Sequence, residues 1–188
     1  SLGAVTSNSA VIANRKGMKP ATTSAETVDC TSGCTTEITK NGDFNVGQGQ
    51  VVCVTGSNIS IGFNANGGTI RICGSNVTVN YANLNNDSKL IVSKSGSVTF
   101  SNLNTNGNAA SVINYGTITT NSGFSPKGNL YNSGDLTVKA DFNLNTTLAS
   151  VNDGLITVGG TVNIHAPNTF TNNGTIITRN FQPNSKTI

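Results

Sequence analysis

The stretch "TNNGTIITRN", Thr171 to Asn180, contains the pattern that decides the fold. It reads Asn, any residue, Gly and then alternating aliphatic residues, and it recurs as "VINYGTITT" (112–120), "LYNSGDLTV" (130–138) and "SVNDGLITV" (150–158). Alternation with a period of two predicts a β-strand with one buried side. The Gly or Ser that opens each such strand stands at positions 68, 88, 116, 134, 154 and 174. Because four of the five steps between these positions are close to a fixed period of about 20 residues, the repeat predicts a solenoid.

A second short strand follows each opening position by about 8 to 11 residues, as in Val77/Val79 and Val162/Ile164. Two or three short strands in about 20 residues are typical of a parallel β-helix, and parallel connections are right-handed as a rule. We therefore predict an all-β, right-handed parallel β-helix of six to seven coils, with a disulfide-containing N-terminal cap. The step from Ser88 to Gly116 exceeds the usual period by about eight residues, which predicts an inserted loop near 105–111.

The Asn that precedes each opening position by two residues forms one column when coils stack about 4.8 Å apart. Stacked amides can bond to one another and to corner backbone groups that would otherwise be buried without a partner. The Gly that follows is predicted to take the positive-φ conformation of a sharp corner. The predicted ladder consists of Asn66, Asn86, Asn114, Asn132, Asn152 and Asn172.

The residues outside the regular repeat suggest further segments. The region before Cys30 has no period and little to bury, which is typical of a flexible leader, and the irregular region after it is expected to cap the first coil. No closing cap is recognisable after the last repeat, so we expect the full-length protein to continue. The predicted segments are a leader at 1–28, a cap at 29–48, the β-helix at 49–181 and a tail at 182–188.

Composition excludes several functional classes. Only 10% of the residues are charged, and the net charge of +3 is not clustered, so the basic stripe of a nucleic-acid-binding protein is missing. No apolar stretch approaches the length of about 18 residues that a membrane-spanning helix needs, so no membrane insertion by a helix is expected. The spacing of Cys30, Cys34, Cys53 and Cys73 does not match two zinc knuckles, and the even count favours two disulfides in an oxidising compartment.

The chain offers little that could perform catalysis. Its eight acidic residues are scattered, and even Asp87 and Asp153, which share the corner position, fall three coils apart. His165, the one histidine, follows an inward Ile164 and has no evident acidic partner. We predict that the protein is not an enzyme and needs no cofactor.

One predicted outer face carries a threonine column, Thr119, Thr137 and Thr157, which is a candidate binding face. It is similar to the flat threonine arrays of β-solenoid ice-binding proteins. Arg71, Lys89 and Asp135 are predicted to interrupt this array, which makes ice binding the most remote alternative, since β-branched residues are ordinary in strands.

The ordered segments "CTSGCTTEIT", "GQGQVVCVTGSNISI" and "NGGTIRICGSNVTV", followed by the repeated units, resemble the secreted, Asn/Gly-rich repeat proteins of gliding and surface-colonising Bacteroidota. Many of those proteins are type IX secretion cargo and surface adhesins. The resemblance covers about Asp29 to Thr178 and implies a secreted or cell-surface location, with adhesion as the role. It implies no catalytic residues. Because Cys53 and Cys73 stand one period apart, a bridge between them and a local Cys30–Cys34 bridge are favoured, while crossed pairing of cap to coils stays open.

Two functional hypotheses follow from these observations. The first is a non-enzymatic structural or adhesive module whose partners are surface glycans or other cell-surface components. The second is a carbohydrate-binding or polysaccharide-degrading β-helix. The missing acidic cluster favours the first hypothesis.

Overall fold

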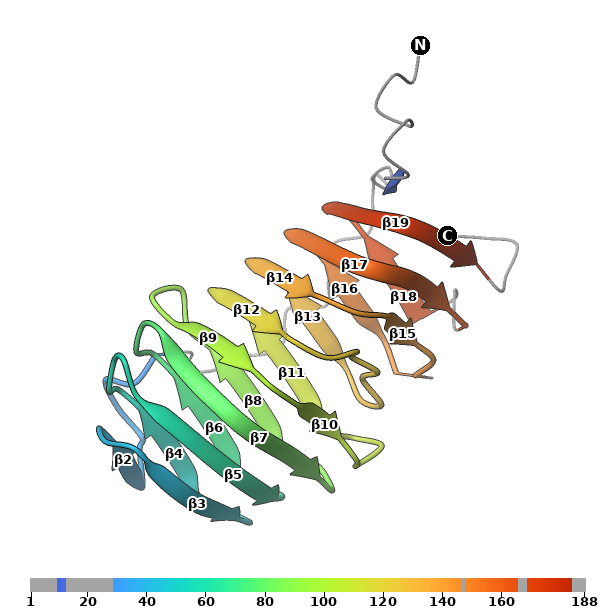
Figure 1. The fold of residues 1–188 in the computed structure, drawn as a ribbon. Coiled ribbons are helices and arrows are strands. Elements are labelled where there is room, and N and C mark those ends of the chain that lie inside the picture. Colours follow the sequence, from blue (N-terminus) through green and yellow to red (C-terminus); the bar gives the residue numbers. More distant parts are fainter. Residues whose placement is uncertain (1–9, 13–28, 147, 166–168, 184–188) are drawn as a thin grey trace.

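The chain forms a parallel β-helix, which confirms the predicted fold class (Figure 1). The structure is a computed structural model that describes residues 10–12, 29–146, 148–165 and 169–183. An eight-stranded sheet contains β2 (Thr36–Ile38), β4 (Val51–Val54), β6 (Thr69–Ile72), β8 (Lys89–Val92), β11 (Ser111–Asn114), β13 (Leu130–Asn132), β16 (Ser150–Asn152) and β18 (Phe170–Asn172). Each of these strands belongs to one coil and pairs in parallel with the strands of the neighbouring coils.

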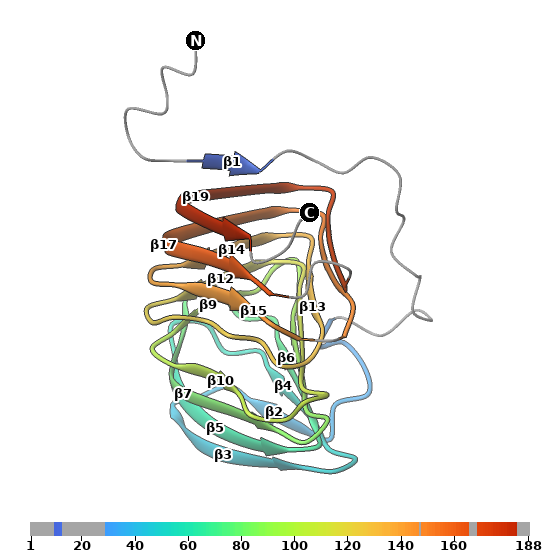
Figure 2. The same ribbon diagram turned by 90° about the vertical axis from the view of Figure 1, so that its right-hand side faces the viewer.

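An eleven-stranded sheet forms the rest of the wall. It contains β1 (Ala10–Ile12), β3 (Gly42–Gly47), β5 (Ser60–Asn66), β7 (Val77–Asn85), β9 (Ser97–Phe100), β10 (Leu103–Thr105), β12 (Thr117–Thr120), β14 (Asp135–Val138), β15 (Phe142–Leu144), β17 (Leu155–Ile164) and β19 (Thr175–Pro183). The register shifts between β5 and β7 at Ile61/Gly62, where β7 carries one extra residue, and between β17 and β19 at Val158/Thr161. These shifts bend the strands, so the larger sheet wraps around two sides of the molecule while the smaller sheet closes the third (Figure 2).

Alternating side chains from both sheets fill the interior. Strand β9 buries Val98 and Phe100, and its register neighbour β12 buries Ile118 and Thr120. Phenylalanine rings stack between coils, with 6.1 Å between the ring centroids of Phe124 and Phe142. The core is therefore continuous along the solenoid axis, and each coil depends on its neighbours for burial.

The predicted insertion near 105–111 is wrong. Leu90 pairs with Val112 of the next coil, so this coil has nearly the ordinary length. The opening positions were misaligned because the strand after Gly116 lies in the larger sheet, where Thr117 pairs with Ser97, whereas the strand after Ser88 lies in the smaller sheet. Two different corners of the coil share one sequence pattern, and the apparent insertion is the step from one corner to the other.

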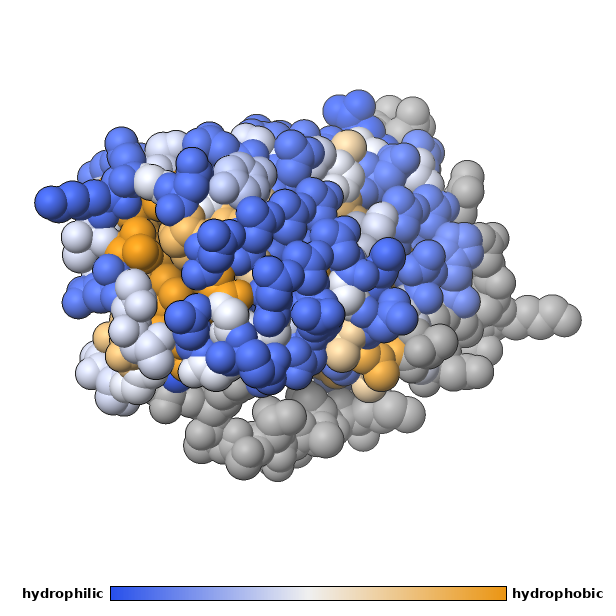
Figure 3. Space-filling view, turned by 90° about the horizontal axis from the view of Figure 1, so that it is seen from below, coloured by the Kyte–Doolittle hydropathy of each residue, from blue (hydrophilic) through white to orange (hydrophobic). Residues whose placement is uncertain are grey.

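The ends of the solenoid also differ from expectation. Strands β2 and β3 pair in parallel with β4 and β5, so residues 36–47 form the first coil and only the segment before them lies outside it. Ile38 and Phe44 are partly buried at this end, where Figure 3 shows hydrophobic residues gathered. At the opposite end β1 pairs antiparallel with β19, so part of the expected leader is a strand. The remaining predictions for 1–28 and for the tail after Pro183 lie outside the described residues.

Candidate functional site

An internal asparagine ladder runs through the last four coils of the smaller sheet. Asn114 donates from Nδ2 to Asn132 Oδ1 at 2.8 Å, Asn132 to Asn152 at 2.9 Å, and Asn152 to Asn172 at 2.8 Å. The same Nδ2 groups donate to corner carbonyls of the following coil, as from Asn132 to Leu155 O at 3.1 Å. The ladder is buried, so the amides supply partners to backbone groups that water cannot reach.

Asn66 and Asn86 do not belong to this ladder, and their inclusion was wrong. The register partner of Asn114 in the coil below is Val92, and the column continues through Ile72 to Val54. The length of the corner explains why the column changes from aliphatic residues to asparagine. Asn114 precedes the next strand, which starts at Thr117, by three residues, whereas Val92 precedes the strand that starts at Ser97 by five. The tight corner brings carbonyls within reach of an inward amide, whereas the residues that stand in this column before the wider corner, Val54, Ile72 and Val92, are aliphatic.

Glycine is required at these corners because there is no room for a side chain. A Cβ on Gly134 would overlap the carbonyl oxygen of Gly116, and Gly154 and Gly174 repeat this contact with the coil below them. None of these glycines has a positive φ, so the predicted reason for them was wrong. In the described chain, positive φ values occur at Asn58, Asn76, Asn86, Gly33, Gly42, Gly49 and Gly67.

Two disulfides bind residues 29–35, which we call the strap, to the outside of the smaller sheet. Cys30 is bonded to Cys73 and Cys34 to Cys53, so the favoured pairing was wrong and the crossed alternative is correct. Cys53 pairs in register with Arg71, because this coil is shorter than the average period, and Cys73 therefore lies two positions beyond the residue opposite Cys53. Because of this offset, Cys53 and Cys73 do not face each other, and each is bonded to a cysteine of the strap.

Arg71 lies beneath the strap. Its guanidinium donates to Ser32 O at 2.6 Å and to Asp29 O at 3.3 Å, and the residue is only 8% exposed. Hydrogen bonds from the Thr31 hydroxyl and backbone lower the pKa of Asp29 below its usual value, and the charge of Arg71 adds to this effect. The strap is therefore held by two covalent bonds and by a nearly buried cation that bonds to its carbonyls.

The predicted threonine column exists as a row of register neighbours. Thr119 pairs with Thr137, which pairs with Thr157, and the row continues below through Thr99 to Thr78. Arg71 and Lys89 do not interrupt it, because both lie in the smaller sheet. Asp135 and Leu155 lie in the adjacent column, beside Thr117. The threonines are thus assembled on one side, and their role as a binding face stays a prediction.

Asp153 and His165, two groups considered for catalysis, make separate contacts with neighbouring coils. Asp153 accepts from the Tyr131 hydroxyl at 3.0 Å and from Asn173 Nδ2 at 2.8 Å. Burial raises the pKa of Tyr131, and the hydrogen bond and charge of Asp153 raise it further. The exposed His165 donates its backbone N–H to Leu144 O at 2.8 Å. Within the described ranges, no group of three or more His, Cys, Asp or Glu residues could hold a metal ion.

A second set of asparagines does not follow the NxG pattern and is therefore not predicted by the repeat. These residues point outward from the second halves of β5 and β7 and from β10. Their signal is a recurring Asn-x-Asn, as "NAN" at 64–66, "NLN" at 83–85 and "NTN" at 104–106. With an inward residue between two outward amides, the motif places two amide columns on one side of the solenoid.

Comparison with known proteins adds nothing to these assignments. No family model matches the chain, and no curated protein and no solved structure matches it either. The resemblance to secreted repeat proteins of Bacteroidota therefore stays a prediction.

Proposed function

We propose that the chain is a non-enzymatic structural module of an extracellular or cell-surface protein, a rigid spacer that displays adhesive parts. The observation that carries this proposal is the disulfide-bonded strap. All four cysteines of the chain are used in it, and stable disulfides are typical of secreted proteins and oxidising compartments. In the described part of the chain, no helix has the length and apolar character needed to cross a bilayer.

The architecture supports the role of a spacer. Every strand of the smaller sheet between its two end strands pairs on both sides, and the core runs the length of the solenoid, so bending it would break hydrogen bonds and packing together. Asp153 and Asp141 are engaged in hydrogen bonds within the wall, the latter accepting from the backbone N–H of Thr161 at 2.8 Å. These carboxylates link neighbouring coils. A hydrolase would instead need a pair of carboxylates placed around a substrate.

The non-enzymatic role is tested by incubating the oxidised protein with a panel of neutral and acidic polysaccharides, with and without calcium. We expect no release of reducing ends or unsaturated products. Turnover of any polysaccharide would overthrow the proposal.

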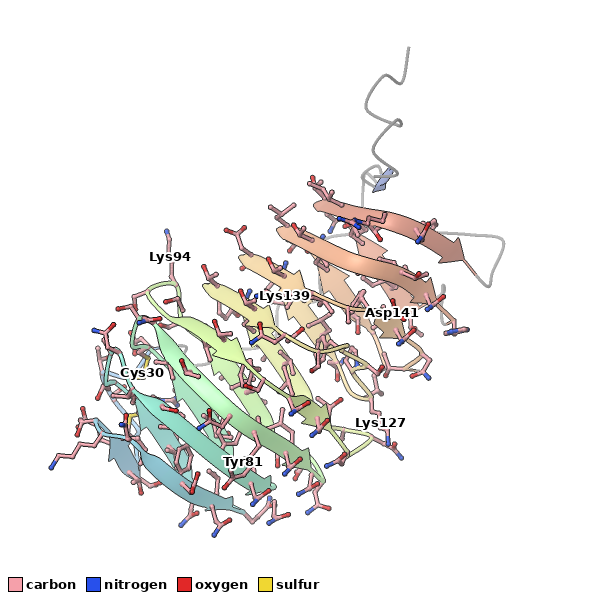
Figure 4. All side chains as sticks on the ribbon, viewed as in Figure 1. Cys30, Tyr81, Lys94, Lys127, Lys139 and Asp141 are labelled. Atoms are coloured by element: carbon pink, nitrogen blue, oxygen red, sulfur yellow. A yellow bond between two sulfur atoms is a disulfide. The ribbon has the colours of Figure 1, made fainter. Side chains whose placement is uncertain are left out.

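The location is tested separately, on intact cells that produce the full-length protein. A membrane-impermeant amine reagent should label it without lysis, through exposed lysines such as Lys94 and Lys139 (Figure 4). Labelling only after lysis would place the protein inside the cell and contradict the proposal.

A further inference from the structure

The outward asparagines define a surface that the structural role does not use. We call it the amide face. Its first column is Asn45, Asn64, Asn83 and Asn104, which are register neighbours in four successive coils. Its second column, two residues further along each strand, is Asn66, Asn85 and Asn106. Charged residues lie at its edges: Asp43 stands two residues before Asn45, and the exposed Asp87 stands two residues after Asn85, beside Gly67.

Hydrogen bonds join the asparagines of each column above the first coil. Asn83 Nδ2 donates to Asn64 Oδ1 at 2.7 Å and Asn104 Nδ2 to Asn83 Oδ1 at 3.1 Å. In the second column, Asn85 and Asn106 each donate to the asparagine one coil below at 3.0 Å. These bonds hold the amide planes in a common orientation, so the face is organised before any partner arrives.

The amide face has hydrogen-bonding capacity that the internal ladder lacks. An amide offers two N–H donors and two acceptor sites, and a bond within the column uses one of each. In the internal ladder Asn132 Nδ2 also donates to Gly134 O and Leu155 O. The outer asparagines, by contrast, are exposed or half-exposed, so solvent or a ligand can reach the amide groups that the column bonds leave over. A group that donates and accepts at once, such as a hydroxyl, is the natural partner.

Tyr81 adds an aromatic surface to the same side (Figure 4). It is the register partner of Gly62, and a Cβ on Gly62 would overlap both the Tyr81 ring and the Asp43 carboxylate. The ring therefore lies across the space that a side chain would fill in the coil below, flat against the sheet. Burial raises the pKa of Tyr81, and the charge and hydrogen bond of Asp43 add to it. This position beside Asn83 combines an apolar ring with flanking amides.

We propose that the amide face and Tyr81 bind an extended, neutral polysaccharide that lies along the solenoid axis. Amides repeat along that axis about every 4.8 Å, and each can bond to a ring hydroxyl while the Tyr81 ring covers the apolar C–H side of one sugar. The amide columns are uncharged, so they match an uncharged partner and offer no steering to an anionic one. A protein partner would require an apolar centre, whereas the outward side chains of both columns are amides. This inference goes beyond the spacer role proposed above.

The binding is tested by affinity electrophoresis of the oxidised chain in gels that contain hydroxyethyl cellulose, galactomannan or dextran, with alginate as the anionic comparison. We expect retardation by at least one neutral polysaccharide and none by alginate. Tyr81→Ala and the double variant Asn83→Thr/Asn104→Thr should each weaken the retardation constant about tenfold. Thr119→Val/Thr137→Val, on the neighbouring side, is the matched control and should bind as the wild type does.

The outcomes separate clearly. Absence of retardation by all three neutral polysaccharides, retardation by alginate alone, or wild-type binding by both amide-face variants would overturn the proposal. Loss of binding in the threonine variant with no loss in the amide-face variants would move the site to the threonine column. If Tyr81→Ala fails to fold, the asparagine variant decides, together with side-chain amide NMR shifts of Asn64, Asn83 and Asn104 on addition of cellohexaose. None of these results depends on whether the spacer role is correct, because that role is judged by turnover and cell-surface labelling.

Discussion

At the scale of single residues, the same amino acid has two different uses in this chain. Asn132 is buried and bonds to backbone carbonyls, whereas Asn143 lies half-exposed on the outer wall and accepts from Asn163 at 2.7 Å. Both asparagines bond to an asparagine of a neighbouring coil. Only Asn132 also supplies a partner to backbone carbonyls that water cannot reach. The difference is measurable as stability.

Replacing Asn132 by Ala should lower the free energy of unfolding by about 3 kcal/mol, because buried donors and acceptors on both neighbouring coils lose their partner. Asn143→Ala is the matched control and should change stability by only about 0.5 kcal/mol. Chemical denaturation followed by circular dichroism measures both. Equal effects of the two substitutions would contradict the distinction between the internal ladder and the outer amides.

Gly134→Ala tests the claim that space, not backbone conformation, requires glycine at the tight corners. The added Cβ would overlap the carbonyl oxygen of Gly116, so the two coils must separate, and we expect a loss of about 1–3 kcal/mol. Gly47→Ala is the control, since its Cβ would meet only the flexible Gln50 side chain, with Oε1 at 3.5 Å. A neutral effect at Gly134 in thermal unfolding would show that the coils are not stacked as closely as described.

Tyr131 should make stability sensitive to alkaline pH. Its pKa is raised in the folded protein, so its contribution is fully present below the pKa of the unfolded chain, near 10, and is lost as the pH rises through the folded value. Tyr131→Phe should therefore flatten the decline in unfolding free energy above about pH 10. Denaturation curves between pH 8 and 11 measure the slope. An unchanged slope in the variant would rule out Tyr131 as its source.

At the scale of elements, the strap is the feature that most clearly separates this chain from a bare solenoid. It crosses β4 and β6 on their outer side and covers Cys53 and Arg71, which would otherwise be exposed there. Its disulfides close loops with sequence separations of 43 and 19 residues, so they restrict the unfolded chain as well as the folded one.

Non-reducing peptide mapping should recover Cys30 linked to Cys73 and Cys34 linked to Cys53. Replacing both Cys34 and Cys53 by Ser should lower the unfolding free energy by about 2–4 kcal/mol, as expected for loss of one native disulfide. The first coils should lose amide-exchange protection before the last ones, because the strap touches only the N-terminal coils. Uniform loss of protection along the chain, or recovery of a Cys53–Cys73 peptide, would contradict the structure.

At the scale of the whole molecule, the architecture could be predicted because its signals are local and repeated. A period of two within strands and a period near 20 between them require a stack of parallel coils, and Asn114, Asn132, Asn152 and Asn172 were correctly placed in one ladder. The ladder's lower end could not be predicted, because the corner after Val92 is wider than the corner after Asn114. Before that point the repeated motif precedes strands of the smaller sheet, and after it the same motif precedes strands of the larger sheet.

The disulfide pairing and the outer face depended on individual coil lengths that the average period hides. The coil between Cys53 and Arg71 is shorter than that average, which separates Cys53 from Cys73 by two positions and turns both toward the strap. The amide face depends on similar detail, since Asn64, Asn83 and Asn104 become neighbours only when coils of slightly unequal length are read in register. Local alternation predicts which residues point outward, but cross-coil register decides which of them meet.

The register of the stacked coils is tested most directly by nuclear Overhauser contacts between the side-chain amide protons of isotope-labelled asparagines. The structure predicts contacts from Asn114 to Asn132, from Asn132 to Asn152 and from Asn152 to Asn172, with none from Asn114 to Asn86. Missing contacts among these four residues, or a contact between Asn86 and Asn114, would contradict the stacked arrangement on which the ladder, the strap and the amide face all depend.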